Sequence, residues 1–82
     1  MGVPVTTTKA ELIAEFQRLD TEYHSCNRRI ELALLRQRFA AGAEEVEYAV
    51  AAERKWLREL DLVMTRLRAV EHHLIEVGKT VE

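Results

Sequence analysis

Residues 36–46 read RQRFAAGAEEV, and this stretch decides the fold because it either interrupts a helix or lies inside one. A single glycine in a helix interior costs only about 1 kcal/mol, so Gly42 alone does not require a break. Arginines at positions 36 and 38 precede the glycine, whereas glutamates at 44, 45 and 47 follow it. Cations stabilise the C-terminus of a helix and anions its N-terminus, because each offsets the helix dipole. The charge reversal predicts that one helix ends and another begins at Gly42.

Hydrophobic residues N-terminal to this break recur with alternating spacings of four and three, which is the pattern of a helix packed along another helix. The series is Leu12, Phe16, Leu19, Tyr23, Cys26, Ile30 and Ala33. Continuing it past Gly42 would bury Glu44 and Glu47, which again favours a break. Thr8-Lys-Ala-Glu11 matches a capping box and predicts the start of this helix.

The second half carries a similar apolar series with one slip in its spacing. It comprises Val46, Val50, Leu57, Leu60, Met64 and Leu67, followed by Val70, Leu74, Val77 and Val81. We expect helices over about 8–41 and 43–77, with Gly78 as a stop signal. Together they form one domain, 8–82, preceded by a disordered N-terminus, 1–7.

The predicted fold is therefore all-α: an antiparallel two-helix hairpin, coiled-coil-like and roughly 50 Å long. The numbers of facing residues should add to roughly 84, and Gln37 and Glu53 should face each other near the turn. Two helices cover only one face of each other, so we expect the fold to be completed by oligomerisation or by a partner.

Composition narrows the class of protein. The 82 residues are 48% hydrophobic and 32% charged, with a formal charge of −2. This composition argues against a disordered chain, a membrane protein and a strongly basic binder of nucleic acid. With one cysteine and no recognisable secretory signal, the chain is expected to be a soluble cytoplasmic protein that does not engage a membrane.

The residues able to do chemistry are few and scattered. His24, His72 and His73 do not share a helix face with Cys26 in a spacing that would bind a metal, and Cys26 itself falls on the apolar series as a small core residue. The sequence also contains no phosphate loop or nucleophile motif. We therefore expect no enzyme activity, no catalytic residue, no cofactor, no metal and no small-molecule substrate.

Basic residues gather in the middle of the hairpin, where nucleic acid would have to bind. They are Arg28, Arg29, Arg54, Lys55 and Arg58. Three glutamates are interleaved with them, Glu31, Glu53 and Glu59, which predicts a mixed, ion-paired surface. Only Trp56 is available nearby for stacking on bases, so nucleic acid ranks third among the expected partners.

Apolar residues beside the two series are the expected interface. The candidates are Leu32, Leu35, Phe39, Trp56 and Val63. Because Ile30, Leu57 and Leu60 are assigned to the contact between the helices, these five remain for another protein. Tryptophan and phenylalanine beside leucine are typical of the residues that dominate binding energy at protein interfaces.

The stretch Ile30–Met64 resembles the YscE-type co-chaperones of bacterial type III secretion, which are small helical hairpins. The shared features are an Ala/Arg-rich end of the first helix, the Ala41-Gly42 turn, Tyr48 one turn into the second helix, and Lys55-x-Leu57. The resemblance implies a cytoplasmic protein that binds a tetratricopeptide-type helical partner and helps keep a needle subunit soluble before export.

We therefore expect a non-catalytic interaction module, a small chaperone or adaptor that presents an apolar helical face to another helical protein. The alternative is a self-associating structural or regulatory coiled-coil protein, in which two hairpins form a four-helix bundle.

Overall fold

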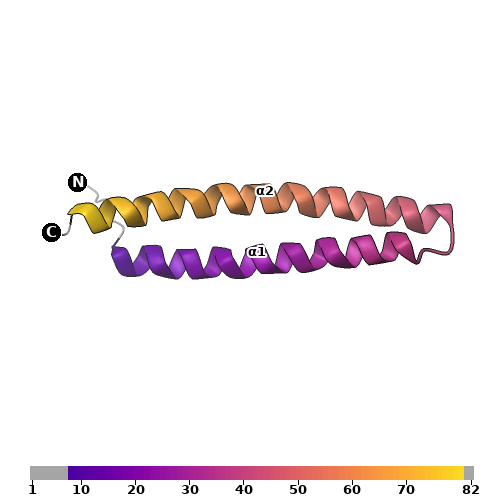
Figure 1. Ribbon diagram of the computed structural model, residues 1–82, viewed down its shortest axis with the longest axis horizontal. Coiled ribbons are helices and arrows are strands. Elements are labelled where there is room, and N and C mark those ends of the chain that lie inside the picture. Colours follow the sequence, from indigo (N-terminus) through magenta and orange to yellow (C-terminus); the bar gives the residue numbers. More distant parts are fainter. Residues whose placement is uncertain (1–7, 81–82) are drawn as a thin grey trace.

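The computed structural model describes residues 8–80 and confirms the all-α hairpin (Figure 1). Helix α1 spans Lys9–Arg38 and helix α2 spans Ala43–Thr80, and the two lie antiparallel along nearly their whole length. The hairpin measures 59 × 24 × 14 Å. The expected disordered N-terminus, 1–7, and Val81 lie outside the described residues.

The start of α1 follows from the predicted capping box. The Thr8 hydroxyl accepts a hydrogen bond from the backbone N–H of Glu11 at 3.1 Å, and the Glu11 carboxylate accepts one from the backbone N–H of Thr8 at 2.9 Å. Each side chain thereby satisfies a backbone donor that the first helical turn leaves unpaired.

The end of α1 comes three residues earlier than expected. Phe39 leaves helical geometry with φ −108° and ψ 16°, while its N–H still donates to the carbonyl of Leu35 at 3.0 Å. Residues 39–42 then carry the chain past the end of α1 to the start of α2, which lies farther along the long axis (Figure 1). The linker needs those residues to cover that distance, so the helix cannot continue to residue 41.

Helix α2 begins at Ala43, directly after Gly42, as predicted. The Gly42 carbonyl accepts a hydrogen bond from the N–H of Val46 at 3.1 Å, which closes the first turn of α2. The Glu45 carboxylate reaches back and accepts a hydrogen bond from the N–H of Ala41 at 2.7 Å. This contact resembles the Glu11 half of the capping box at α1.

The expectation that Gly78 ends the second helix is wrong. Helix α2 continues through Gly78 to Thr80. One glycine costs a helix only about 1 kcal/mol, and no linker or turn has to follow it over the described residues.

The buried face of α1 is the predicted one. Its fully buried residues lie seven apart: Leu12, Leu19, Cys26 and Ala33. Phe16 and Tyr23 pack against this line and are partly buried. The spacing of four and three residues therefore identified the contact face of α1 correctly.

The buried face of α2 differs from the prediction. Ala49, Val63 and Val70 are buried, whereas Val46 and Leu57, which were assigned to the contact, are 38% and 45% exposed. The partly buried residues that complete the core on α2 are Trp56, Leu60, Leu67, Leu74 and Val77. The observed line keeps the spacing of four and three from Ala49 to Val77 without a slip, so it stays opposite the line on α1.

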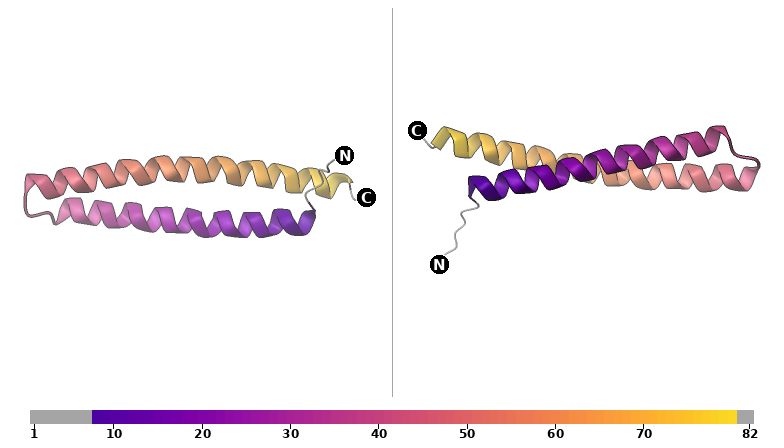
Figure 2. Two further views of the ribbon diagram at one scale, coloured as in Figure 1. Left: turned by 180° about the vertical axis from the view of Figure 1, so that it is seen from behind. Right: turned by 90° about the horizontal axis from the view of Figure 1, so that it is seen from below.

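Two contacts between side chains define the register. The Arg29 guanidinium lies over the Trp56 ring, 4.4 Å from its centroid, in agreement with the expected register to within one residue. Gln37 hydrogen-bonds Glu53, which lies five residues beyond the position opposite Gln37 in the register of the Arg29–Trp56 contact. The two side chains can meet because each leans toward the N-terminus of its own helix. Figure 2 shows that the two helices also cross when viewed from below. Over the described residues, neither helix is long and apolar enough to cross a membrane.

Candidate interaction surface at the hinge

An apolar surface lies at the end of the hairpin where α1 passes into α2. A groove of about 720 Å³ is lined there by Leu32, Leu35, Phe39, Ala40 and Tyr48. Its polar border comprises Arg36, Glu44 and Glu45. We call this groove and its border the hinge face.

Helix periodicity explains how the hinge face forms. Leu32, Leu35 and Phe39 are spaced three and four residues apart, so they form one stripe on α1 that lies outside the buried line. Tyr48 faces the same groove from the second turn of α2. Phe39 is 75% exposed and Tyr48 is 71% exposed. Two large aromatic side chains are therefore in contact with solvent next to half-exposed leucines.

The structure brings three of the five predicted interface residues together. Leu32, Leu35 and Phe39 all line the hinge face. Tyr48 was missed as an interface residue because it lies outside the apolar series of its helix. Tyr48 lies four residues after Glu44, so the two side chains share one side of α2. This spacing could have identified Tyr48 as a residue of the hinge face.

The other two predicted interface residues lie elsewhere. Val63 is only 4% exposed and belongs to the core between the helices, so the assignment of Val63 to a free surface is wrong. Trp56 is half-buried against the same core. The burial of both residues has one cause. The observed contact line on α2 runs through Trp56 and Val63, whereas the prediction placed them beside the contact line.

Trp56 keeps one accessible edge next to the hinge face. Together with Tyr48, Ala51, Ala52 and Lys55 it lines a shallow groove of about 260 Å³. The Lys55 ammonium lies 5.1 Å from the centroid of the Trp56 ring, on which Arg29 also rests. Tyr48 lines both grooves, so the apolar surface continues from Phe39 along α2 to Trp56.

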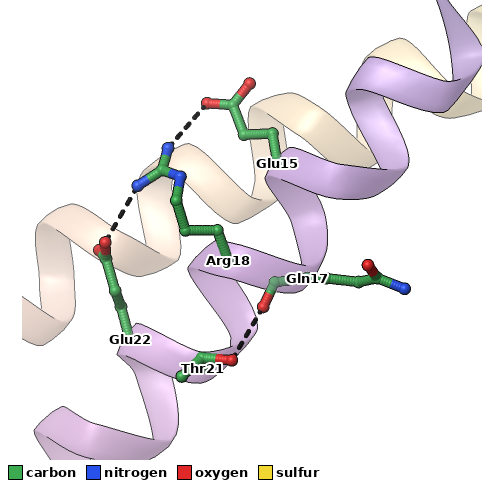
Figure 3. Close-up of polar contacts among 5 residues, drawn as sticks. All are labelled: Glu15, Gln17, Arg18, Thr21 and Glu22. Carbon is green, nitrogen blue, oxygen red and sulfur yellow. Dashed lines mark hydrogen bonds and ion pairs between the residues drawn. The ribbon is translucent and has the colours of Figure 1, made fainter.

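The expectation that the basic patch in the middle of the hairpin is ion-paired is wrong. Among the described lysines and arginines, ion pairs are formed by Arg18, which lies 3.5 Å from Glu15 and 3.0 Å from Glu22 (Figure 3). Among the side chains that the structure describes, none forms such a pair with Arg28, Arg29, Arg54, Lys55 or Arg58. For Arg29 and Lys55 the physical reason is the Trp56 ring, whose negative face attracts both cations.

The histidines and the cysteine do not line the hinge face. His24 lies 3.6 Å from Asp20 and His72 lies 3.8 Å from Glu76, each pair one turn apart on an exposed helix surface. Burial, followed by the nearby carboxylates of Glu59 and Glu22, raises the pKa of the Cys26 thiol. Among the described residues, no three side chains of His, Cys, Asp or Glu converge on a point where a metal would bind.

Comparison with known proteins gives no relative for this arrangement: no family model, curated protein or solved structure matches the chain.

Proposed function

We propose that this protein is a non-catalytic interaction module, a small adaptor or chaperone whose hinge face binds an α-helix of another protein molecule. The observation that carries the proposal is the exposure of Phe39 and Tyr48 on one groove. Clustered aromatic residues on the surface of a small protein mark sites of association, because burying them removes a large apolar area from water.

The small core supports the same proposal. Over the described residues, seven hydrophobic side chains are buried, and Leu19 is the one large side chain that is completely enclosed. A chain of this size buries a smaller fraction of its surface than a larger domain does, so covering the hinge face adds stabilisation that the monomer lacks. Apolar burial contributes about 25 cal/mol per Å², which makes a groove of this kind a substantial source of binding energy.

The shape of the groove favours a helical ligand. Its walls are two helices that diverge into a short linker, and a third helix can lay an apolar stripe between them. Arg36 on one side and Glu44 and Glu45 on the other offer charged contacts to the polar flanks of such a helix. These charges would fix its direction more than its affinity.

The resemblance to YscE-type co-chaperones fits this location. The Ala41-Gly42 turn and Tyr48, which carry part of that resemblance, lie at or beside the hinge face. If the resemblance extends to function, the ligand is a helix of a tetratricopeptide-type protein in the cytoplasm, and the complex helps keep a needle subunit soluble before export.

Site-specific photocrosslinking in the producing cell tests the proposal. A benzophenone amino acid at position 39 preserves an aromatic group and should form a defined protein adduct that resists nuclease treatment. The same probe at Thr65, which is exposed on α2 away from the hinge, is the matched control. Leu35→Asp should abolish the adduct at position 39. Equal crosslinking at both positions, or an adduct unaffected by Leu35→Asp, would overturn the proposal.

A further inference from the structure

We propose that the hinge face binds a second copy of this chain in a two-fold symmetric dimer; this inference rests on the proposed function and names its ligand. In this dimer, α2 of each copy runs antiparallel to α2 of the other. Glu44 of each copy lies beside Lys55 of the other.

The distribution of charge along α2 carries the inference. Glu44 lies on the hinge face, at the acidic end of the apolar surface that continues along α2, and Lys55 lies beside Trp56 and Arg29 at the basic end of that surface. The two positions are about 16 Å apart along the helix, at 1.5 Å per residue. Neither side chain forms an ion pair over the described part of the chain. An unpaired acid and an unpaired base therefore stand at opposite ends of one apolar surface.

Such a surface is complementary to itself. In a two-fold contact, residue i of one copy touches residue j of the other, and j touches i in return. A two-fold axis midway between positions 44 and 55 exchanges the acidic and basic ends. Both Glu44–Lys55 pairs then form at once, and each apolar centre faces the other.

The side chains near this axis suit a close contact between two helices. Tyr48 is on one side of the midpoint, and Ala51 and Ala52 are on the other, in the shallow groove that ends at Trp56. Alanine side chains leave room for a neighbouring helix, so Tyr48 of each copy can fill the groove beside Trp56 of the other. Phe39 and Leu32 flank the contact from α1 and extend it toward a four-helix arrangement.

Charge exchange between two variants tests this geometry by sedimentation velocity over a range of concentrations. The intact chain should show a reversible dimer. Glu44→Lys alone and Lys55→Glu alone should each weaken dimerisation by about tenfold or more, since each variant places like charges opposite each other twice. An equimolar mixture of the two variants should recover a heterodimer with an affinity within a few-fold of the unmodified dimer.

Asp61→Lys provides the matched control, because it makes the same change of charge on α2 outside the hinge face and should leave dimerisation unchanged. Circular dichroism of each variant checks that the helices remain intact. A monomer at all concentrations, unaffected single variants, or a mixture that fails to recover the dimer would each overturn the inference. If the chain is monomeric while the probe at position 39 captures a different protein, the proposed function stands and the second copy is not its ligand.

Discussion

Gln37 donates a hydrogen bond from Nε2 to Oε1 of Glu53 over 2.7 Å, and this pair joins the two helices just inside the hinge. Both side chains are half-buried and occupy positions that continue the two apolar contact lines. The pair therefore allows a polar residue on each helix within a contact that is otherwise apolar, because each side chain satisfies the other.

Replacing one partner of this pair is expected to cost more than replacing both. Glu53→Leu leaves the Gln37 amide without its acceptor, whereas Gln37→Leu combined with Glu53→Leu restores a uniform apolar contact. Urea unfolding of the two single variants and the double variant should give a coupling energy of about 1 kcal/mol, the usual net value of a hydrogen bond in a protein. Additive effects of the two substitutions would show that the hydrogen bond contributes nothing to stability.

Glu53 also explains why the sequence identified one contact face and missed the other. On α1 the alternating spacing reaches Ala33 without a charged residue, and the buried line matched the prediction. On α2 the observed contact line contains the charged residue Glu53. The prediction favoured a different series, through Val46 and Leu57, because all of its residues are apolar. The expected pairing of Gln37 with Glu53 is confirmed, and it makes a carboxylate acceptable on the contact line of α2.

The interface candidates were placed correctly on one helix and wrongly on the other, because the contact face was predicted correctly for α1 alone. Leu32 and Leu35 lie on α1, whose buried face was predicted correctly, and Phe39 directly follows this helix. All three residues line one groove. Trp56 and Val63 lie on α2, where a rotation of the predicted face exchanged buried and exposed positions. Tyr48 joins the groove because the linker brings the second turn of α2 beside Phe39, and helix periodicity alone does not specify the path of a linker.

Leu19 should be the most sensitive single position in the hairpin. Its side chain is completely buried, so Leu19→Ala removes apolar contacts and leaves a cavity that costs about 3 kcal/mol. Leu62 is 52% exposed, and Leu62→Ala should change the free energy of unfolding by less than about 0.5 kcal/mol. Denaturant unfolding followed by helical circular dichroism compares the two leucines directly. Similar losses at both positions would contradict the observed contact face of α1.

Cys26 should react slowly with thiol reagents and should link stability to alkaline pH. The thiol is 5% exposed, and burial raises its pKa, so little thiolate forms near neutral pH. Because the folded state holds the proton more tightly than the unfolded state, the contribution of Cys26 to stability is complete below the usual thiol pKa of about 8.5. That contribution is lost as pH rises through the higher pKa of the folded protein.

Two measurements check this behaviour of Cys26. Labelling with a disulfide reagent at neutral pH should be slow in the native protein and fast in denaturant. Cys26→Ala should unfold more easily than the unmodified chain at pH 7, yet its stability should fall less steeply between about pH 8 and pH 10. Rapid labelling of the native protein, or identical pH dependence of the two proteins, would place Cys26 outside the core.

Gly42→Ser is expected to strengthen the hinge by placing a capping hydroxyl at the N-terminus of α2. Glu45 already accepts a hydrogen bond from the Ala41 N–H, but Gly42 has no side chain to accept one from the first turn of α2. Serine at this position reproduces the Thr8-x-x-Glu11 arrangement that begins α1. A Cβ atom at Gly42 meets nothing within 4 Å, so the substitution fits without a clash. The expected gain is about 0.5 kcal/mol in the free energy of unfolding.

Gly42→Ala is the matched control, because it adds the Cβ without the hydroxyl and should recover only the part due to reduced freedom of the unfolded chain. Thermal unfolding of the three proteins separates the contributions, and a Gly42→Ser protein no more stable than Gly42→Ala would show that α2 gains nothing from a capping hydroxyl.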